Sequence, residues 1–80
     1  MANQELIRYL QKLRLDAGLQ QTDVAKALGY KTSQFVSNWE RGASMPPIKA
    51  LRTLADLYQV PAETIYLKVE KAVIGLLFKS

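Results

Sequence analysis

The sequence predicts an all-α protein built from five short helices. Apolar residues recur at helical spacing in successive segments, a glycine or a proline follows each of the first four segments, and no alternation of apolar and polar residues lasts long enough for a strand. At 80 residues, with 49% hydrophobic and 22% charged side chains, the chain has the size and balance of one small globular domain. We therefore expect a single core, with any functional residues on its surface.

The first predicted helix covers residues 3–17 and ends before Gly18, which suits a left-handed stop. After a link of Leu19 and Gln20, a second helix of about two turns ends at Gly29. Both helices present an apolar side at spacings of three and four residues. The residues on these two apolar sides are Leu6, Leu10, Leu13, Ala17, Val24, Ala25 and Leu28.

The third predicted helix begins at a cap provided by Thr32 or Ser33 and ends at Gly42. It has an apolar side and a polar side. We expect Trp39 to anchor the apolar side in the core rather than to stack on a base, because it is spaced with other apolar residues. The apolar side contains Phe35, Val36 and Trp39, and the polar side contains Gln34, Ser37, Asn38 and Arg41.

The fourth predicted helix starts at Pro46 and Pro47, because proline fits the first helical turn, where its missing N–H would have had no partner. This helix runs to about Tyr58, and Pro61 separates it from a fifth helix that opens at Glu63. The sequence contains no internal repeat and no low-complexity linker. The five helices are therefore expected to follow one another through short connections.

The positive charge of the chain is concentrated in its middle third. The net charge is +4, with 11 Lys and Arg against 7 Asp and Glu. Residues 26–52 carry this whole excess, whereas residues 1–25 and 53–80 are neutral. A localised basic segment is typical of a surface that neutralises phosphates, and a solvated charged face is the alternative. The basic residues of the segment are Lys26, Lys31, Arg41, Lys49 and Arg52.

The second and third predicted helices are joined by a tight turn that contains Gly29, and the outer side of the third helix is polar. This arrangement is typical of a helix that enters the major groove of DNA, which is about 12 Å wide. Gln34 and Asn38 are the first candidates for base contacts, because an amide binds adenine with two hydrogen bonds. The full set of candidate base contacts is Ser33, Gln34, Ser37 and Asn38.

A resemblance to the lambda-repressor/Cro class of helix-turn-helix domains, the XRE family, is carried by residues 19–29, 36–42 and 51–60 together with Pro46. The resemblance covers residues 6–67. It implies a five-helix DNA-binding domain that acts as a transcriptional regulator, with double-stranded DNA as its partner.

The resemblance also implies roles for individual residues. By position, Gln21 is expected to contact a phosphate and to brace Gln34, while Arg41 lies near the DNA backbone. Arg14, late in the first helix, and Glu40, before the end of the third, are expected to form a structural ion pair. The candidate structural residues are Arg14, Trp39 and Glu40, and the candidate phosphate contacts are Gln21, Lys31, Thr32 and Arg41.

The segment from Gly29 to Glu40 is one residue longer than the family pattern, with Tyr30 and Lys31 in the turn. Lys31 is placed for the DNA backbone, whereas Tyr30 either touches a phosphate or sugar or covers apolar surface. Gln59 stands where glycine often ends the fourth helix of the family. The register of the base contacts therefore depends on how the longer turn folds.

Residues 65–78 contain ten apolar residues among fourteen, more than one stripe against a core requires. We expect residues 1–67 to form the DNA-binding domain and residues 68–80 to form an apolar helix or arm for homodimerisation. The alternative is that residues 72–78 fold back onto their own subunit. The candidate dimerisation residues are Val73, Ile74, Leu77 and Phe78.

Cysteine and histidine are both absent, which removes thiolate nucleophiles, the imidazole base and the common soft metal ligands. The sequence also lacks a glycine-rich phosphate loop and a pocket-forming pair of carboxylates. We therefore expect no enzymatic activity, no cofactor, no metal and no small-molecule ligand. Because no apolar stretch approaches the roughly 20 residues of a membrane span, we expect a cytoplasmic protein of bacterial or phage type.

One recognition helix offers roughly three or four base contacts, whereas telling an operator from random DNA takes about 4–10 kcal/mol. Two copies bound to an inverted repeat double the number of base contacts and so supply the remaining free energy of discrimination. The half-sites are then about 34 Å apart. The sequence thus predicts a homodimeric repressor that binds an inverted-repeat operator. The alternative is an antitoxin or a protein-binding cofactor that uses the same fold on a protein partner.

Overall fold

The computed structural model describes residues 4–77, and all five elements within them are α-helices. The all-α, five-helix fold predicted from the sequence is confirmed. Within the described residues, no helix is both long enough and apolar enough to cross a membrane. The helices are α1 (Gln4–Asp16), α2 (Gln21–Ala27), α3 (Gln34–Glu40), α4 (Ile48–Tyr58) and α5 (Ala62–Leu77).

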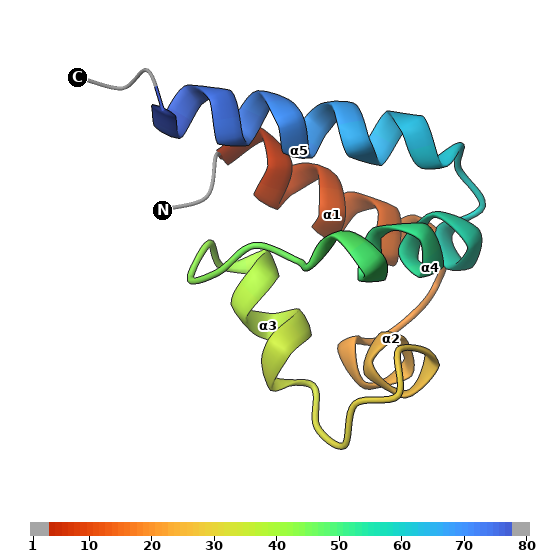
Figure 1. Cartoon of the computed structure of the whole chain (residues 1–80). Helices are drawn as coiled ribbons and strands as arrows, with labels where there is room; N and C mark the ends of the chain where they lie inside the picture. Colours follow the sequence, from red (N-terminus) through yellow and green to blue (C-terminus); the bar gives the residue numbers. More distant parts are fainter. Residues whose placement is uncertain (1–3, 78–80) are drawn as a thin grey trace.

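The five helices place the α2–α3 unit at one end of the molecule and α5 at the other (Figure 1). α5 packs on α1 and α4, α1 also contacts α3, and α2 contacts both α3 and α4. The turn between α2 and α3 lies farthest from α5 in this view. α1 and α4 therefore support the α2–α3 unit from behind, and its outer side faces away from the other helices.

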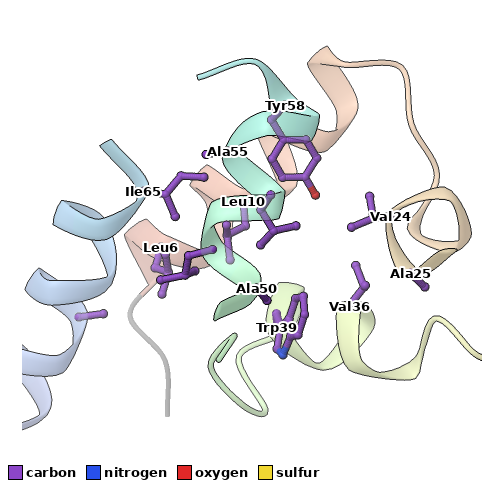
Figure 2. Packing of buried hydrophobic residues seen from close by; sticks show 13 residues of the cluster. Leu6, Leu10, Val24, Ala25, Val36, Trp39, Ala50, Ala55, Tyr58 and Ile65 are labelled. Atoms are coloured by element: carbon purple, nitrogen blue, oxygen red, sulfur yellow. The ribbon is translucent and has the colours of Figure 1, made fainter. Parts of the chain in front are cut away.

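The core draws on all five helices (Figure 2). Val24 of α2 and Val36 of α3 are buried and face each other, and Trp39 of α3 is only 3% exposed. Burying an apolar side chain of this kind contributes about 1.5–3 kcal/mol. These contacts hold the inner side of α3 in place. The largest fully buried side chains are Leu6, Leu51, Leu54, Ile65, Val24 and Val36.

The prediction that Phe35 belongs to the buried apolar side of the third helix is wrong. Its side chain is 54% exposed. Each residue turns an α-helix by about 100°, and the buried stripe of α3 passes through Val36, Trp39 and Glu40. Phe35 is left at the edge of that stripe, on the surface of α3.

Each of the first four helices is followed by a residue in the left-handed region of backbone conformation, and two of these ends bear on the fold. Gly42 follows α3 with a φ of 80°, and a Cβ built on it would lie 2.7 Å from Cδ1 of Ile7. Glycine permits this close approach, which brings the end of α3 against α1. Gln59 ends α4 with a φ of 58° and a ψ of 46°, a conformation that costs a residue with a side chain about 1 kcal/mol. The end of α4 is therefore a strained point of the fold.

Candidate nucleic-acid interface

The carboxylate of Glu40, at the end of α3, binds Arg14 of α1. The guanidinium donates from Nε to Oε2 at 2.8 Å and from Nη2 to Oε1 at 2.9 Å, and its Nη1 donates to the carbonyl of Leu19 at 2.9 Å. The Arg14 and Glu40 side chains are only 11% and 4% exposed. The hydrogen bonds with Glu40 raise the pKa of Arg14 above its usual value. This doubly hydrogen-bonded ion pair fixes α3 on α1.

Gln21, the first residue of α2, binds the same carboxylate. Its Nε2 donates to Oε1 of Glu40 at 3.2 Å, whereas the family resemblance implied that Gln21 braces Gln34. In the structure, Gln34 donates to Asn38 instead. The difference has a physical reason, because a charged acceptor gives a stronger hydrogen bond than a neutral amide. α1, α2 and α3 therefore meet at one carboxylate.

Three polar side chains form a row along the side of α3 that faces away from the core. Nε2 of Gln34 donates to Oδ1 of Asn38 at 3.0 Å, and Nη2 of Arg41 donates to the same oxygen at 2.6 Å. Residues three and four positions apart are neighbours on one side of a helix. We call Gln34, Asn38 and Arg41 the polar row. It combines two amides, which suit base edges, with a guanidinium, which suits a phosphate.

The other predicted contacts lie around the start of α3. Oγ1 of Thr32 accepts a hydrogen bond from the backbone N–H of Gln34 at 3.2 Å, and the carbonyl of Ser33 accepts one from the backbone N–H of Ser37 at 2.9 Å. Lys31 and Thr32 are exposed, whereas Ser33 and Ser37 are half-buried. Gln34 is thus the most open of the candidate base contacts, and the two serines lie deeper.

The basic residues of the middle segment are all exposed. They come from α2, the α2–α3 turn, the end of α3 and α4. The ion pairs among residues 4–77 use other basic residues, so these charges are open to phosphates. By contrast, no three acidic, histidine or cysteine side chains of the described residues lie together as metal ligands would. The exposed basic residues are Lys26, Lys31, Arg41, Lys49 and Arg52.

Comparison with known families decides what kind of domain this is. A family model for helix-turn-helix domains matches residues 10–65, which run from α1 into α5. The chain belongs to the helix-turn-helix family. The match is to the XRE/lambda-repressor-like class, so the chain is a DNA-binding helix-turn-helix regulator. No curated protein and no solved structure matched the chain in two further comparisons.

The longer α2–α3 turn of this helix-turn-helix protein holds an aromatic cluster. The ring of Tyr30 lies 4.9 Å from that of Phe35 and 6.0 Å from that of Trp39. Tyr30 is half-buried, so it covers apolar surface, one of the two roles that the sequence left open. Sequence reasoning missed Phe35 as a surface residue. Phe35 follows Gln34 directly, so it lies about 100° from Gln34 around the helix axis. This angle could have indicated from the sequence that Phe35 lies near the polar side of α3.

The helix-turn-helix protein exposes a second surface between α4 and α5. An apolar groove of about 280 Å³ lies there, and its lining residues include Ile48 of α4 and Val73 and Ile74 of α5. These three side chains and Leu77 are exposed large hydrophobic residues. Contiguous apolar surface on a small domain marks an interaction site.

α5 is a single helix across the predicted boundary between residues 67 and 68. On its inner side Ala72 is buried in the core, and Nζ of Lys68 lies 2.9 Å from Oε1 of Glu5 in α1. Hydrogen bonding to Lys68 lowers the pKa of Glu5. The segment is therefore helical through Leu77 rather than an extended arm, and the remaining predicted dimer residue, Phe78, lies outside the described residues.

Proposed function

We propose that this helix-turn-helix protein is a homodimeric transcriptional repressor that acts in the bacterial cytoplasm and binds an inverted-repeat operator with the outer side of α3. The observation that carries the proposal is the polar row, in which Gln34, Asn38 and Arg41 share one side of α3. On the opposite side, the ion pair of Glu40 with Arg14 fixes the orientation of the helix. Direct recognition of base edges requires such a rigid helix with amides on its outer side.

Contact with a base requires the side chains of the polar row to replace their hydrogen bonds to one another with hydrogen bonds to DNA. Oδ1 of Asn38 accepts from both Gln34 and Arg41 in the free protein, whereas a bidentate contact with adenine needs this oxygen to accept from the N6 amino group. The bond from Gln34 contributes only about 0.5–1.5 kcal/mol and the charged one from Arg41 about 1.5–3 kcal/mol, so contacts with DNA of the same kinds can replace them. Arg41 then turns to a phosphate. The other proposed contacts are Ser33 and Ser37 to bases, and Gln21, Lys31 and Thr32 to the backbone.

A second copy doubles the number of base contacts. The exposed apolar side of α5 and the groove beside it support dimerisation, because pairing two copies removes this surface from water. Residues 68–80 thus act as the dimerisation segment and residues 1–67 as the DNA-binding domain. The proposed dimer residues are Val73, Ile74, Leu77 and Phe78.

A second candidate function keeps the fold and places a different protein on α5, as in an antitoxin or a protein-binding cofactor. The observation in its favour is the same apolar groove, because an apolar groove is the kind of surface that binds an amphipathic helix of another protein. Sedimentation of the purified chain separates the two functions. A dimer at micromolar concentration supports the repressor, and a monomer supports the protein-binding role.

Replacing Gln34 or Asn38 with alanine should remove operator preference without unfolding the protein. Each amide is expected to supply about 1–3 kcal/mol of base discrimination, or roughly 5-fold to 150-fold. The melting temperature should change little, because neither side chain belongs to the buried core. Competition between a selected operator and random duplex DNA measures the effect, with Gln11→Ala on the exposed side of α1 as the matched control. Unchanged discrimination in both α3 variants removes the polar row from base recognition.

Lys31→Ala should weaken binding to every DNA sequence alike. Lys31 is exposed in the α2–α3 turn, and its proposed phosphate contact releases a bound counterion. The slope of log affinity against log salt concentration should become shallower by about 0.9. Titrations at several salt concentrations measure this slope, with Lys12→Ala as the control because Lys12 is paired with Asp16 on α1. A slope equal to that of the unaltered protein places Lys31 outside the interface.

A further inference from the structure

We propose that Phe35 is a specificity-determining residue whose ring contacts the C5 methyl group of a thymine in the major groove. Tyr30 acts as its positioning residue. This inference rests on the proposed function, because it requires α3 to lie against base edges. It adds an apolar contact to a surface that is otherwise made of amides, hydroxyl groups and basic side chains.

Phe35 is exposed and yet held in place. Its side chain is 54% exposed, and its ring packs 4.9 Å from that of Tyr30. Tyr30 in turn lies 6.0 Å from the ring of Trp39, which is buried in the core, and its backbone N–H donates to the carbonyl of Ala25 at 2.9 Å. A chain of aromatic contacts therefore runs from the core to the surface. A ring that is already ordered loses little conformational entropy when it binds.

The position of Phe35 on α3 brings it to the base edges. It is the second residue of the helix, and the N-terminal part of a recognition helix makes the base contacts. Around the helix axis it stands about 60° from Asn38 and about 100° from Gln34. Phe35 thus borders the polar row on the side of the α2–α3 turn.

Thymine is the partner that fits this neighbourhood. Amides such as Gln34 and Asn38 select adenine, and the thymine of an A·T pair presents its methyl group on the same major-groove edge. This methyl is the apolar group that bases offer there, and phenylalanine is one of the side chains that contact it. The two amides and the ring beside them therefore both favour A·T pairs, the amides by binding adenine and the ring by contacting the methyl group of thymine.

The test removes the methyl group alone. Duplexes are selected from a random pool by the full chain, and each thymine of the selected site is then replaced singly by deoxyuridine. We expect one thymine in each half-site at which the replacement weakens binding about fourfold, or ~0.8 kcal/mol. In Phe35→Ala and in Phe35→Gln, the same replacement should cause no measurable loss.

Leu15→Ala is the matched control, because Leu15 is a comparably exposed apolar residue on α1 and should leave the fourfold response intact. Circular dichroism tests whether each variant is folded. One folded Phe35 variant is sufficient for the comparison. If no thymine responds in the unaltered protein, or if both Phe35 variants keep the full response, the inference is wrong and the proposed function stands. If the unaltered protein selects no sequence from the pool, the proposed function fails, and this inference fails with it.

Discussion

Glu40→Ala should destabilise the fold by about 3–5 kcal/mol, because it leaves the guanidinium of Arg14 buried without its partner. The substitution removes the two hydrogen bonds that Glu40 accepts from Arg14 and the third that it accepts from Gln21, so α3 loses its polar attachment to both α1 and α2. Small domains have a total stability of only about 5–15 kcal/mol, so the loss is a large share. Urea unfolding followed by circular dichroism measures it. Arg14→Ala should destabilise for the converse reason, because the carboxylate is then unpaired.

The control for this prediction is an ion pair at the surface. Lys12 and Asp16 lie four residues apart on α1, and their side chains are 72% and 60% exposed. Such a pair contributes about 0–1 kcal/mol, so Lys12→Ala should shift the unfolding midpoint only slightly. Equal losses in Lys12→Ala and Glu40→Ala would show that the pair with Arg14 is not what holds α3.

Ile74→Glu combined with Leu77→Glu should convert the proposed dimer into a monomer. Both side chains are exposed and apolar in the structure, so the monomer should still fold, whereas a dimer interface would have to bury four added carboxylates. A monomer contacts one half-site, so it loses about half of the 4–10 kcal/mol that separates an operator from random DNA, roughly 30-fold or more. Sedimentation measures the oligomeric state, and operator titration measures the affinity.

The matched variant is Leu15→Glu, which places one such carboxylate on an exposed apolar residue of α1. It should leave both the oligomeric state and the melting temperature unchanged. An intact dimer in the α5 double variant places the interface elsewhere on the molecule. A monomeric unaltered protein instead favours the protein-binding alternative.

The helices could be predicted because their signals are local. Apolar spacing and glycine or proline stops depend on neighbours within a few residues, and the observed helices follow these signals closely. The joint between Arg14 and Glu40 is different, since the two residues are 26 positions apart. The spacing of residues along the sequence cannot predict this ion pair, and the resemblance to a family was needed to predict it.

Two features of the site could not be obtained from the sequence. The resemblance implied that Gln21 braces Gln34, and its hydrogen bond to the charged carboxylate of Glu40 depends on where the fold places that carboxylate. Phe35 was predicted to share the apolar side of its helix with Val36 and Trp39, but a seven-residue helix buries only a narrow stripe. The groove that Ile48 lines likewise depends on how α4 and α5 pack against each other.

Because α1 and α2 are attached to the carboxylate of Glu40, the two sides of the short helix α3 have different roles. Residues on its inward side determine the angle at which α3 is presented, and residues on its outward side determine which chemical groups it meets. The two sets do not overlap. Substitutions on the outward side of α3 alone can therefore change which DNA sequence is preferred. The residues that fix the orientation of α3 stay the same.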